Sequence, residues 1–168
     1  MTPASPPSPR YLADTSVLWR LLFGTVAAPW PARVAEGLVT ICPVAHAELR
    51  NVLRPGVDPA PFYQALDRAF GSVPLKHFNR QSEAADVVKQ LRASGIGYTP
   101  SLMDVMTVLT ARDHGLTVVH TDDRFDAIGR MLPGVPMIKV AADRPPRPAV
   151  DPNANRRRRS FLRSLLDD

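Results

Sequence analysis

The chain has 168 residues, of which 45% are hydrophobic and 22% charged, and this composition predicts one globular domain. Its single cysteine, Cys42, excludes an internal disulfide and suits a cytoplasmic location. The sequence has no run near the ~20 apolar residues of a membrane span, and its Pro-rich start has no apolar core, so it indicates neither a membrane protein nor a signal peptide. The formal net charge is +5, but residues 156–168, with five arginines and two aspartates, carry +3 and leave +2 for the rest, so this charge is weak support for a nucleic-acid-binding core.

Strands and helices are expected to alternate along the chain, because short β-rich runs separate amphipathic segments. The first half should hold a strand at 10–14, helices at 16–23 and 32–37, a strand at 38–41, helices at 43–53 and 58–70, and a weak strand at 72–75. The second half should hold a helix at 79–94, a helix at 100–114 begun by Thr99 and ended by Gly115, a strand at 116–120, a helix at 124–131 and a strand at 137–140.

This order predicts an α/β fold, a three-layer α/β/α sandwich around a mostly parallel sheet of four to five strands. Residues 1–9 are expected to be a disordered lead-in, residues 10–141 the folded domain, and residues 142–168 a Pro- and Arg-rich tail. Two interpretations of residues 156–159 stay open: contact with RNA phosphate, or a solubilising tail. The apolar positions at 161–166 indicate a segment that folds against a partner or a second copy of the chain.

Two carboxylates follow predicted strands. Asp14 ends the first strand, and Asp122 lies just past the strand at 116–120. Open α/β sheets bind ligands at the carboxyl ends of their strands, so both residues stand where a site is expected. For Asp14 alone, the start of a helix is an equally good interpretation.

Two further acidic residues lie inside predicted helices. Asp104 has apolar neighbours on both sides, from Leu102 to Met106, and is expected to be buried, which is costly for a carboxylate without a partner or a metal. The alternative for Asp104 is a capping interaction in the first turn of its helix. Glu48 is expected at the edge of the buried side of its helix, and a solvated position is the alternative. That buried side is expected to consist of Val44, Ala47, Val52 and Leu53.

Four converging carboxylates repel one another unless a cation holds them. An all-oxygen ligand set selects Mg²⁺ or Mn²⁺, and such an ion activates water and stabilises charge on a phosphate. The acidic residues therefore indicate phosphodiester hydrolysis.

Four segments in this order resemble the PIN domain family, and most of all the VapC-type toxins of bacterial toxin–antitoxin pairs. They read YLADTSVLWRLL, PVAHAELRNVL, TPSLMDVMTVLTARDHGL and TVVHTDDRFDAI, and together they run through nearly all of the predicted domain. The resemblance implies a PIN-like fold and a metal-dependent endoribonuclease with an RNA substrate. It also implies a homodimer and a small antitoxin protein that blocks the acidic pocket.

The resemblance also assigns roles to residues. It implies that Asp14, Glu48, Asp104 and Asp122 are catalytic, and that Mg²⁺ or Mn²⁺ is bound by Asp14, Asp104 and Asp122. Ser16 would support Asp14, a water or the phosphate, or simply cap the first helix.

The chain departs from the family after Asp122. The family often has D-x-D-F at this point, whereas this chain has Asp122, Asp123, Arg124 and Phe125. Either Asp123 takes the second acidic role, or Arg124 contacts phosphate in its place. Asp122 matches the family position and is preferred to Asp123 as the fourth carboxylate.

Other functions stay open beside the toxin. A housekeeping PIN-type ribonuclease without antitoxin, and a catalytically inactive PIN-fold binding module, would share the same sequence features. A phosphatase of the haloacid-dehalogenase type is disfavoured, because Ser16 stands where that mechanism needs a second aspartate two residues after Asp14.

Overall fold

The computed structural model describes residues 9–22, 25–50, 58–76, 80–95 and 99–141. The elements are, in order, β1 (Tyr11–Ala13), α1 (Thr15–Leu22), α2 (Trp30–Ala35), β2 (Val39–Thr40), α3 (Pro43–Arg50), α4 (Ala60–Phe70), α5 (Arg80–Ala93), α6 (Leu102–His114), β3 (Thr117–His120), α7 (Arg124–Met131) and β4 (Met137–Lys139). Within these ranges, no helix is long and apolar enough to cross a membrane. The predictions for residues 1–8 and for the tail at 142–168 lie outside the described residues.

The four strands form one parallel sheet in the order β2-β1-β3-β4. The predicted α/β class and parallel sheet are confirmed, with four strands. The weak strand at 72–75 is reduced to a single bridge, in which Ile41 pairs with Ser72. The chain leaves β1 toward β2 on one side and returns to place β3 on the other. The order of strands therefore reverses between β1 and β3, where open α/β sheets carry their ligand sites.

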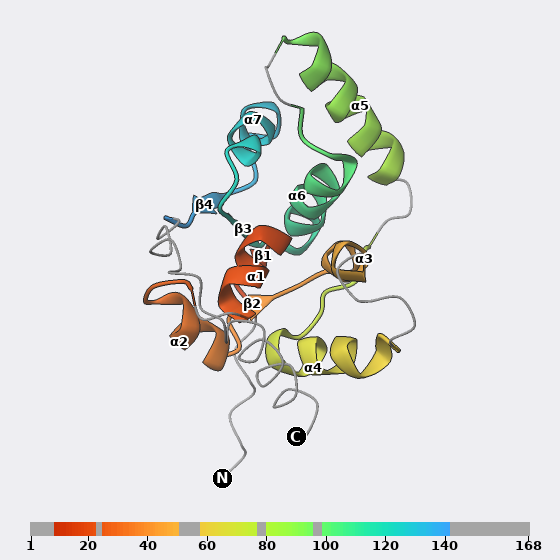
Figure 1. Ribbon diagram of the computed structural model, residues 1–168. Helices are drawn as coiled ribbons and strands as arrows, with labels where there is room; N and C mark the ends of the chain where they lie inside the picture. Colours follow the sequence, from red (N-terminus) through yellow and green to blue (C-terminus); the bar gives the residue numbers. More distant parts are fainter. Residues whose placement is uncertain (1–8, 23–24, 51–57, 77–79, 96–98, 142–168) are drawn as a thin grey trace, which may run out of the picture.

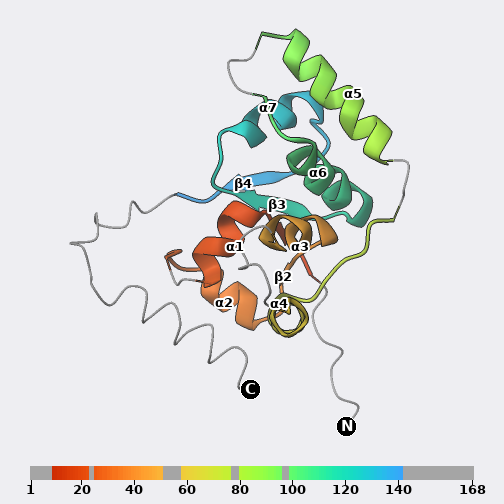
Figure 2. The same ribbon diagram turned by 45° about the vertical axis from the view of Figure 1, so that its right-hand side comes forward.

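Helices cover both faces of the sheet, so the predicted three-layer sandwich is confirmed (Figures 1 and 2). Neighbouring residues of one strand point to opposite faces. Leu12 and Val118 belong to a core with α5, α6 and α7, while Ala13 and Val119 belong to a core with α1, α2 and α4. The period of two in the strands thus divides the interior into two apolar layers.

Helix α3 takes part in both layers. Val44 packs in the first core, whereas Ala45 and Leu49 pack in the second. The predicted buried position of Ala47 was wrong, because this residue is exposed. The prediction for residues 51–53 at the end of this helix lies outside the described residues.

Most predicted boundaries hold within one or two residues, but the start of α6 was predicted wrongly. The helix begins after Ser101, not after Thr99. Ser101 and Asp104 are three residues apart and satisfy each other's backbone N–H groups, which is the capping box. At the other end the prediction is confirmed: Gly115 takes a left-handed conformation with φ of 64°.

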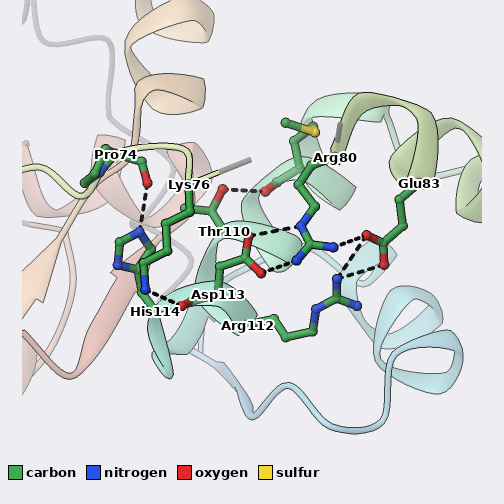
Figure 3. Close-up of polar contacts among 9 residues, drawn as sticks. Pro74, Lys76, Arg80, Glu83, Thr110, Arg112, Asp113 and His114 are labelled. Atoms are coloured by element: carbon green, nitrogen blue, oxygen red, sulfur yellow. Dashed lines mark hydrogen bonds and ion pairs between the residues drawn. The ribbon is translucent and has the colours of Figure 1, made fainter. Parts of the chain in front are cut away.

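An ion-pair network joins α5 to the end of α6 (Figure 3). Arg80 donates two hydrogen bonds to the Asp113 carboxylate, at 3.0 and 2.6 Å, and a third to Glu83. Glu83 also accepts from Arg112 at 2.8 Å, and Lys76 donates to the Asp113 carbonyl. The Asp113 side chain is only 7% exposed, so these partners compensate for its burial.

Candidate active site

Asp14 lies at the carboxyl end of β1, beside β3, and is only 5% exposed. Its backbone N–H donates to the Val119 carbonyl at 2.9 Å, which ties it to the neighbouring strand. Its Oδ2 accepts the Ser16 backbone N–H at 2.9 Å, at the start of α1. Asp14 therefore caps the start of α1 and also lies at the predicted carboxyl edge of the sheet. The two interpretations of this residue, as a helix cap and as a strand-end carboxylate, are compatible.

Ser16 connects this corner to the turn after β3. Its Oγ accepts the backbone N–H of Thr121 at 3.2 Å, while its own backbone N–H binds Asp14. The hydroxyl thus holds the turn that carries Asp122 against the start of α1.

Asp104 reaches the same edge from the first turn of α6 and is 6% exposed, so its predicted burial is confirmed. Its Oδ2 accepts the Ser101 backbone N–H at 2.7 Å. The capping alternative is therefore also correct, and it fixes the carboxylate in one position. A helix that leads into a parallel strand begins at the carboxyl edge of the sheet, which is why Asp104 and Asp14 come close.

Glu48 projects from α3 and is partly buried. Its Oε2 accepts a short hydrogen bond from the hydroxyl of Thr15, the residue after Asp14. The sequence analysis did not single out Thr15. No local signal connects it with a residue 33 positions away; only the packing of α1 on α3 brings the two together.

The three carboxylates influence one another. Burial raises the pKa of Asp14; hydrogen bonds from Ser16 offset part of the rise, and the charge of Asp104 adds to it. Burial also raises the pKa of Glu48, while its bond from Thr15 lowers it. The charges of Asp14 and Asp104 raise the Glu48 pKa further. Negative charge is thus concentrated in a poorly solvated corner.

Arg124 is the cation beside this cluster. Its Nε donates to Asp122 Oδ2 at 2.8 Å and its backbone N–H donates to Asp122 Oδ1 at 2.9 Å, while its Nη2 forms an ion pair with Oδ2 at 2.6 Å. Its Nη1 lies 3.7 Å from Asp104 Oδ2. These hydrogen bonds from Arg124 hold the pKa of Asp122 below its usual value. Arg124 therefore connects the Asp122 turn to the buried carboxylates.

Asp123 has a different environment. Its side chain is 64% exposed and forms an ion pair with Lys139 of β4, which also lies 3.7 Å from Asp126. The structure brings Asp14, Glu48, Asp104 and the Asp122–Arg124 pair to one edge, and it pairs Asp123 with the neighbouring strand.

His120, the last residue of β3, packs beneath the turn that carries Asp122 and hydrogen-bonds to it. It is 1% exposed, stacks on Phe125 with ring centroids 4.7 Å apart, and its Nδ1 lies 2.9 Å from the Asp122 carbonyl. Burial lowers the pKa of His120, so the ring is neutral and Nδ1 donates to the carbonyl.

The donor set suits a divalent cation. Four carboxylates and one guanidinium leave these five residues with three formal negative charges, and carboxylate oxygens are the ligands that Mg²⁺ and Mn²⁺ prefer. Within the part of the chain that is described, no three acidic, cysteine or histidine side chains stand close enough to hold one ion in their present positions. The residues fit the ion by chemistry and location, and side-chain adjustment would have to complete the geometry.

Comparison with known proteins places this site in a family. The PIN domain profile matches residues 11–131, which include all four carboxylates. Ribonuclease VapC2 of Mycobacterium tuberculosis (strain CDC 1551 / Oshkosh) is 30% identical over 124 residues, covering 73% of this chain and 86% of the relative.

Among solved structures, VapBC2 from Rickettsia felis, bound to a DNA fragment from its promoter, matches 78% of this chain and 98% of the other, with a TM-score of 0.57 and 10% identity. PAE2754 from Pyrobaculum aerophilum covers 77% and 90% of the two chains, with a TM-score of 0.49 and 19% identity. At 10% identity, the likeness to the Rickettsia felis chain concerns the fold alone. The sheet order, the acidic edge and the profile match agree: the chain belongs to the PIN domain family.

Proposed function

We propose that the chain is a Mg²⁺- or Mn²⁺-dependent endoribonuclease and the toxin of a toxin–antitoxin pair. Membership of the PIN domain family and 30% identity to a protein named Ribonuclease VapC2 support the nuclease activity. The observation that carries the proposal is the group of Asp14, Glu48 and Asp104, buried or partly buried and mutually repelling at the switch point of the sheet.

In this proposal, Asp14 and Asp104 would hold the ion, and Glu48 lies beside them. When bound, it supplies a Lewis acid that lowers the pKa of water and offsets the charge on the attacked phosphate. The chain's own residues set the geometry. Ser16 and Ser101 orient Asp14 and Asp104 through backbone hydrogen bonds, and Thr15 orients Glu48.

Glu48 is our candidate for the proton acceptor. Its raised pKa brings it closer to neutrality, where a carboxylate takes a proton from an attacking water more effectively. Water attacks phosphorus, the bond to the leaving ribose oxygen breaks with its electron pair going to that oxygen, the water proton passes to Glu48, and the leaving oxygen takes a proton from solvent.

The direct test is cleavage of a 5′-labelled mixed RNA pool by the purified chain with Mn²⁺, Mg²⁺ or EDTA. Asp104→Asn keeps an oxygen that accepts the Ser101 N–H, so the variant should fold and lose cleavage. Asp86→Asn, at an exposed position of α5, is the matched control and should cleave like wild type. Metal-independent cleavage, or full activity of Asp104→Asn, would contradict the proposal.

The partners are part of the same proposal: an antitoxin that covers the acidic edge, and a homodimer. The structural likeness to a chain of the Rickettsia felis VapBC2 assembly supports an antitoxin partner. Co-expression with the product of an adjacent short reading frame should yield a stable complex without cleavage activity. Light scattering of the isolated chain should give twice the monomer mass; a monomer without any co-purifying partner would favour a housekeeping nuclease.

A further inference from the structure

We propose that Arg124 binds the phosphate of the RNA, and that Asp122 positions this arginine and is not a metal ligand. This inference rests on the proposed nuclease function and divides the acidic edge into two parts. Asp14 and Asp104, with Glu48 beside them, form the cation-binding part, and the Asp122–Arg124 pair forms the phosphate-binding part.

The hydrogen bonds of Asp122 carry the first step of the argument. Both of its carboxylate oxygens accept from Arg124: Oδ1 from the backbone N–H at 2.9 Å, and Oδ2 from Nε at 2.8 Å, while Nη2 forms an ion pair with Oδ2 at 2.6 Å. A charge-assisted hydrogen bond of this kind is short and about twice as strong as a neutral one. Ligation of a cation by Asp122 would have to break this pair, whereas the pair as it stands fixes the direction of the guanidinium.

The second step concerns the Nη1 atom of the Arg124 guanidinium. Nη1 lies 3.7 Å from Asp104 Oδ2, which is longer than a hydrogen bond, and the Arg124 side chain is 40% exposed. Its planar fork can bind two phosphate oxygens at once. Nη1 therefore lies beside the carboxylate cluster, where an RNA phosphate would have to lie for cleavage.

Electrostatics supply the third step. A phosphate that approaches Asp14, Glu48 and Asp104 meets charge of its own sign. The positive charge of Arg124 lies close to this group, since its Nη1 is 3.7 Å from Asp104 Oδ2. A fixed cation at the rim reduces the repulsion that the RNA has to overcome.

The turn around the pair is built to hold it. His120 donates to the Asp122 carbonyl, and Thr121 donates its N–H to Ser16. Arg124 is the first residue of α7, so its backbone is fixed by the helix that follows. Little conformational freedom is left to lose when a phosphate binds, which favours binding.

The test compares three variants of the full chain. Arg124→Ala removes the proposed phosphate contact. Asp122→Asn keeps an oxygen for the Arg124 backbone N–H, so the turn should keep its conformation. It presents an NH₂ group to the guanidinium, so the Arg124 side chain should no longer be held in one orientation. Lys139→Ala is the matched control, because it removes the same charge from nearby β4 without touching Asp122 or Asp104.

With a single-stranded RNA substrate, Arg124→Ala should raise KM about tenfold, the value of one charge-assisted contact. It should also reduce the slope of log(kcat/KM) against log[salt] by about 0.7. Asp122→Asn should reproduce both effects, and the double variant should be no worse than Arg124→Ala alone. Lys139→Ala should change KM less than about threefold.

A second readout needs no RNA. Calorimetric titration with Mn²⁺ alone should give Asp122→Asn a Kd within about threefold of wild type, whereas Asp104→Asn should weaken binding by a factor of ten or more. A tenfold loss in Asp122→Asn, together with a wild-type KM in Arg124→Ala, would overturn the inference and make Asp122 a ligand. Absence of cleavage by the wild type would instead overturn the proposed function, and the Mn²⁺ titration would still decide the role of Asp122.

Discussion

Asp14→Asn is expected to abolish cleavage and, in the absence of metal, to stabilise the fold at neutral pH. The asparagine keeps an oxygen for the Ser16 N–H that begins α1, so the 2.9 Å hydrogen bond can persist. The lost negative charge is buried, 5% exposed, and repelled by Asp104. Removal of such a charge should favour the folded state.

The pH dependence gives this effect a sign and a size. The pKa of Asp14 is raised on folding above its unfolded value of 3.8, so between 3.8 and the folded pKa the folded chain binds more protons than the unfolded chain. Its contribution to stability is therefore complete below 3.8 and is lost as pH rises through the folded pKa. One such group changes the free energy of unfolding by up to about 1.4 kcal/mol per pH unit. Glu48, whose pKa is also raised, acts in the same direction: its contribution to stability is complete below 4.5 and is lost as pH rises through the folded pKa.

Urea unfolding followed by circular dichroism in EDTA, from pH 4 to pH 8, would measure this difference. Groups with opposite shifts, such as His120 and Asp122, are present in both proteins, so the difference between wild type and Asp14→Asn reports Asp14 together with its charge interactions with neighbours such as Glu48. With saturating Mn²⁺ the wild type should become more stable than Asp14→Asn, because only the wild type gains the full free energy of Mn²⁺ binding. If Asp14→Asn is less stable than wild type by more than about 1 kcal/mol at pH 7 in EDTA, the reasoning is refuted, because the carboxylate would then be held by attraction.

Three further variants test other parts of the structure. Thr15→Val removes the hydrogen bond to Glu48 and should lower kcat about tenfold while costing about 1 kcal/mol of stability, as measured by RNA cleavage and urea unfolding; Thr15→Ser should restore both. Asp113→Ala removes the bonds between Arg80 and α6 and should destabilise the fold by about 2 kcal/mol without changing kcat. A double-mutant cycle with Arg80→Ala should show a coupling energy between the two residues. Additive losses of stability would mean that the network of Figure 3 contributes nothing as a unit. Gly115→Ala meets no atom within 4 Å but keeps a φ of +64°, so it should cost about 1 kcal/mol in unfolding experiments through backbone strain alone, and an unchanged midpoint would contradict that account.

The layered fold was predictable because strands and helices alternate with clear periods. The sheet buries Leu12 and Ala13 on opposite faces, as a parallel strand between two helical layers requires. Asp14 and Asp122 could be placed from their positions at strand ends, and Asp104 from its apolar neighbours. Each of these signals is local, so it survives without knowledge of the tertiary structure.

The parts that escaped prediction depend on contacts between distant segments or on a choice between equivalent local signals. Thr15 meets Glu48 only through helix packing, and the bonds of Arg124 to Asp122 and toward Asp104 depend on rotamers. At the start of α6, Thr99 and Ser101 are both good caps, and Pro100 suggested the wrong one. The spacing of Ser101 and Asp104 was the better signal, because a capping box needs an acceptor three residues after the cap.

The capping box has a consequence for how many oxygens the acidic edge can offer. Asp104 commits Oδ2 to the Ser101 N–H, and Asp14 commits Oδ2 to the Ser16 N–H. As long as both helices keep their first turns, an approaching cation meets one uncommitted oxygen from each residue and no chelating pair. Such a corner suits a small ion with six well-ordered ligands better than Ca²⁺, which readily takes both oxygens of a carboxylate. In our proposed function, the hydrogen bonds that start two helices would thereby favour Mg²⁺ or Mn²⁺ over Ca²⁺.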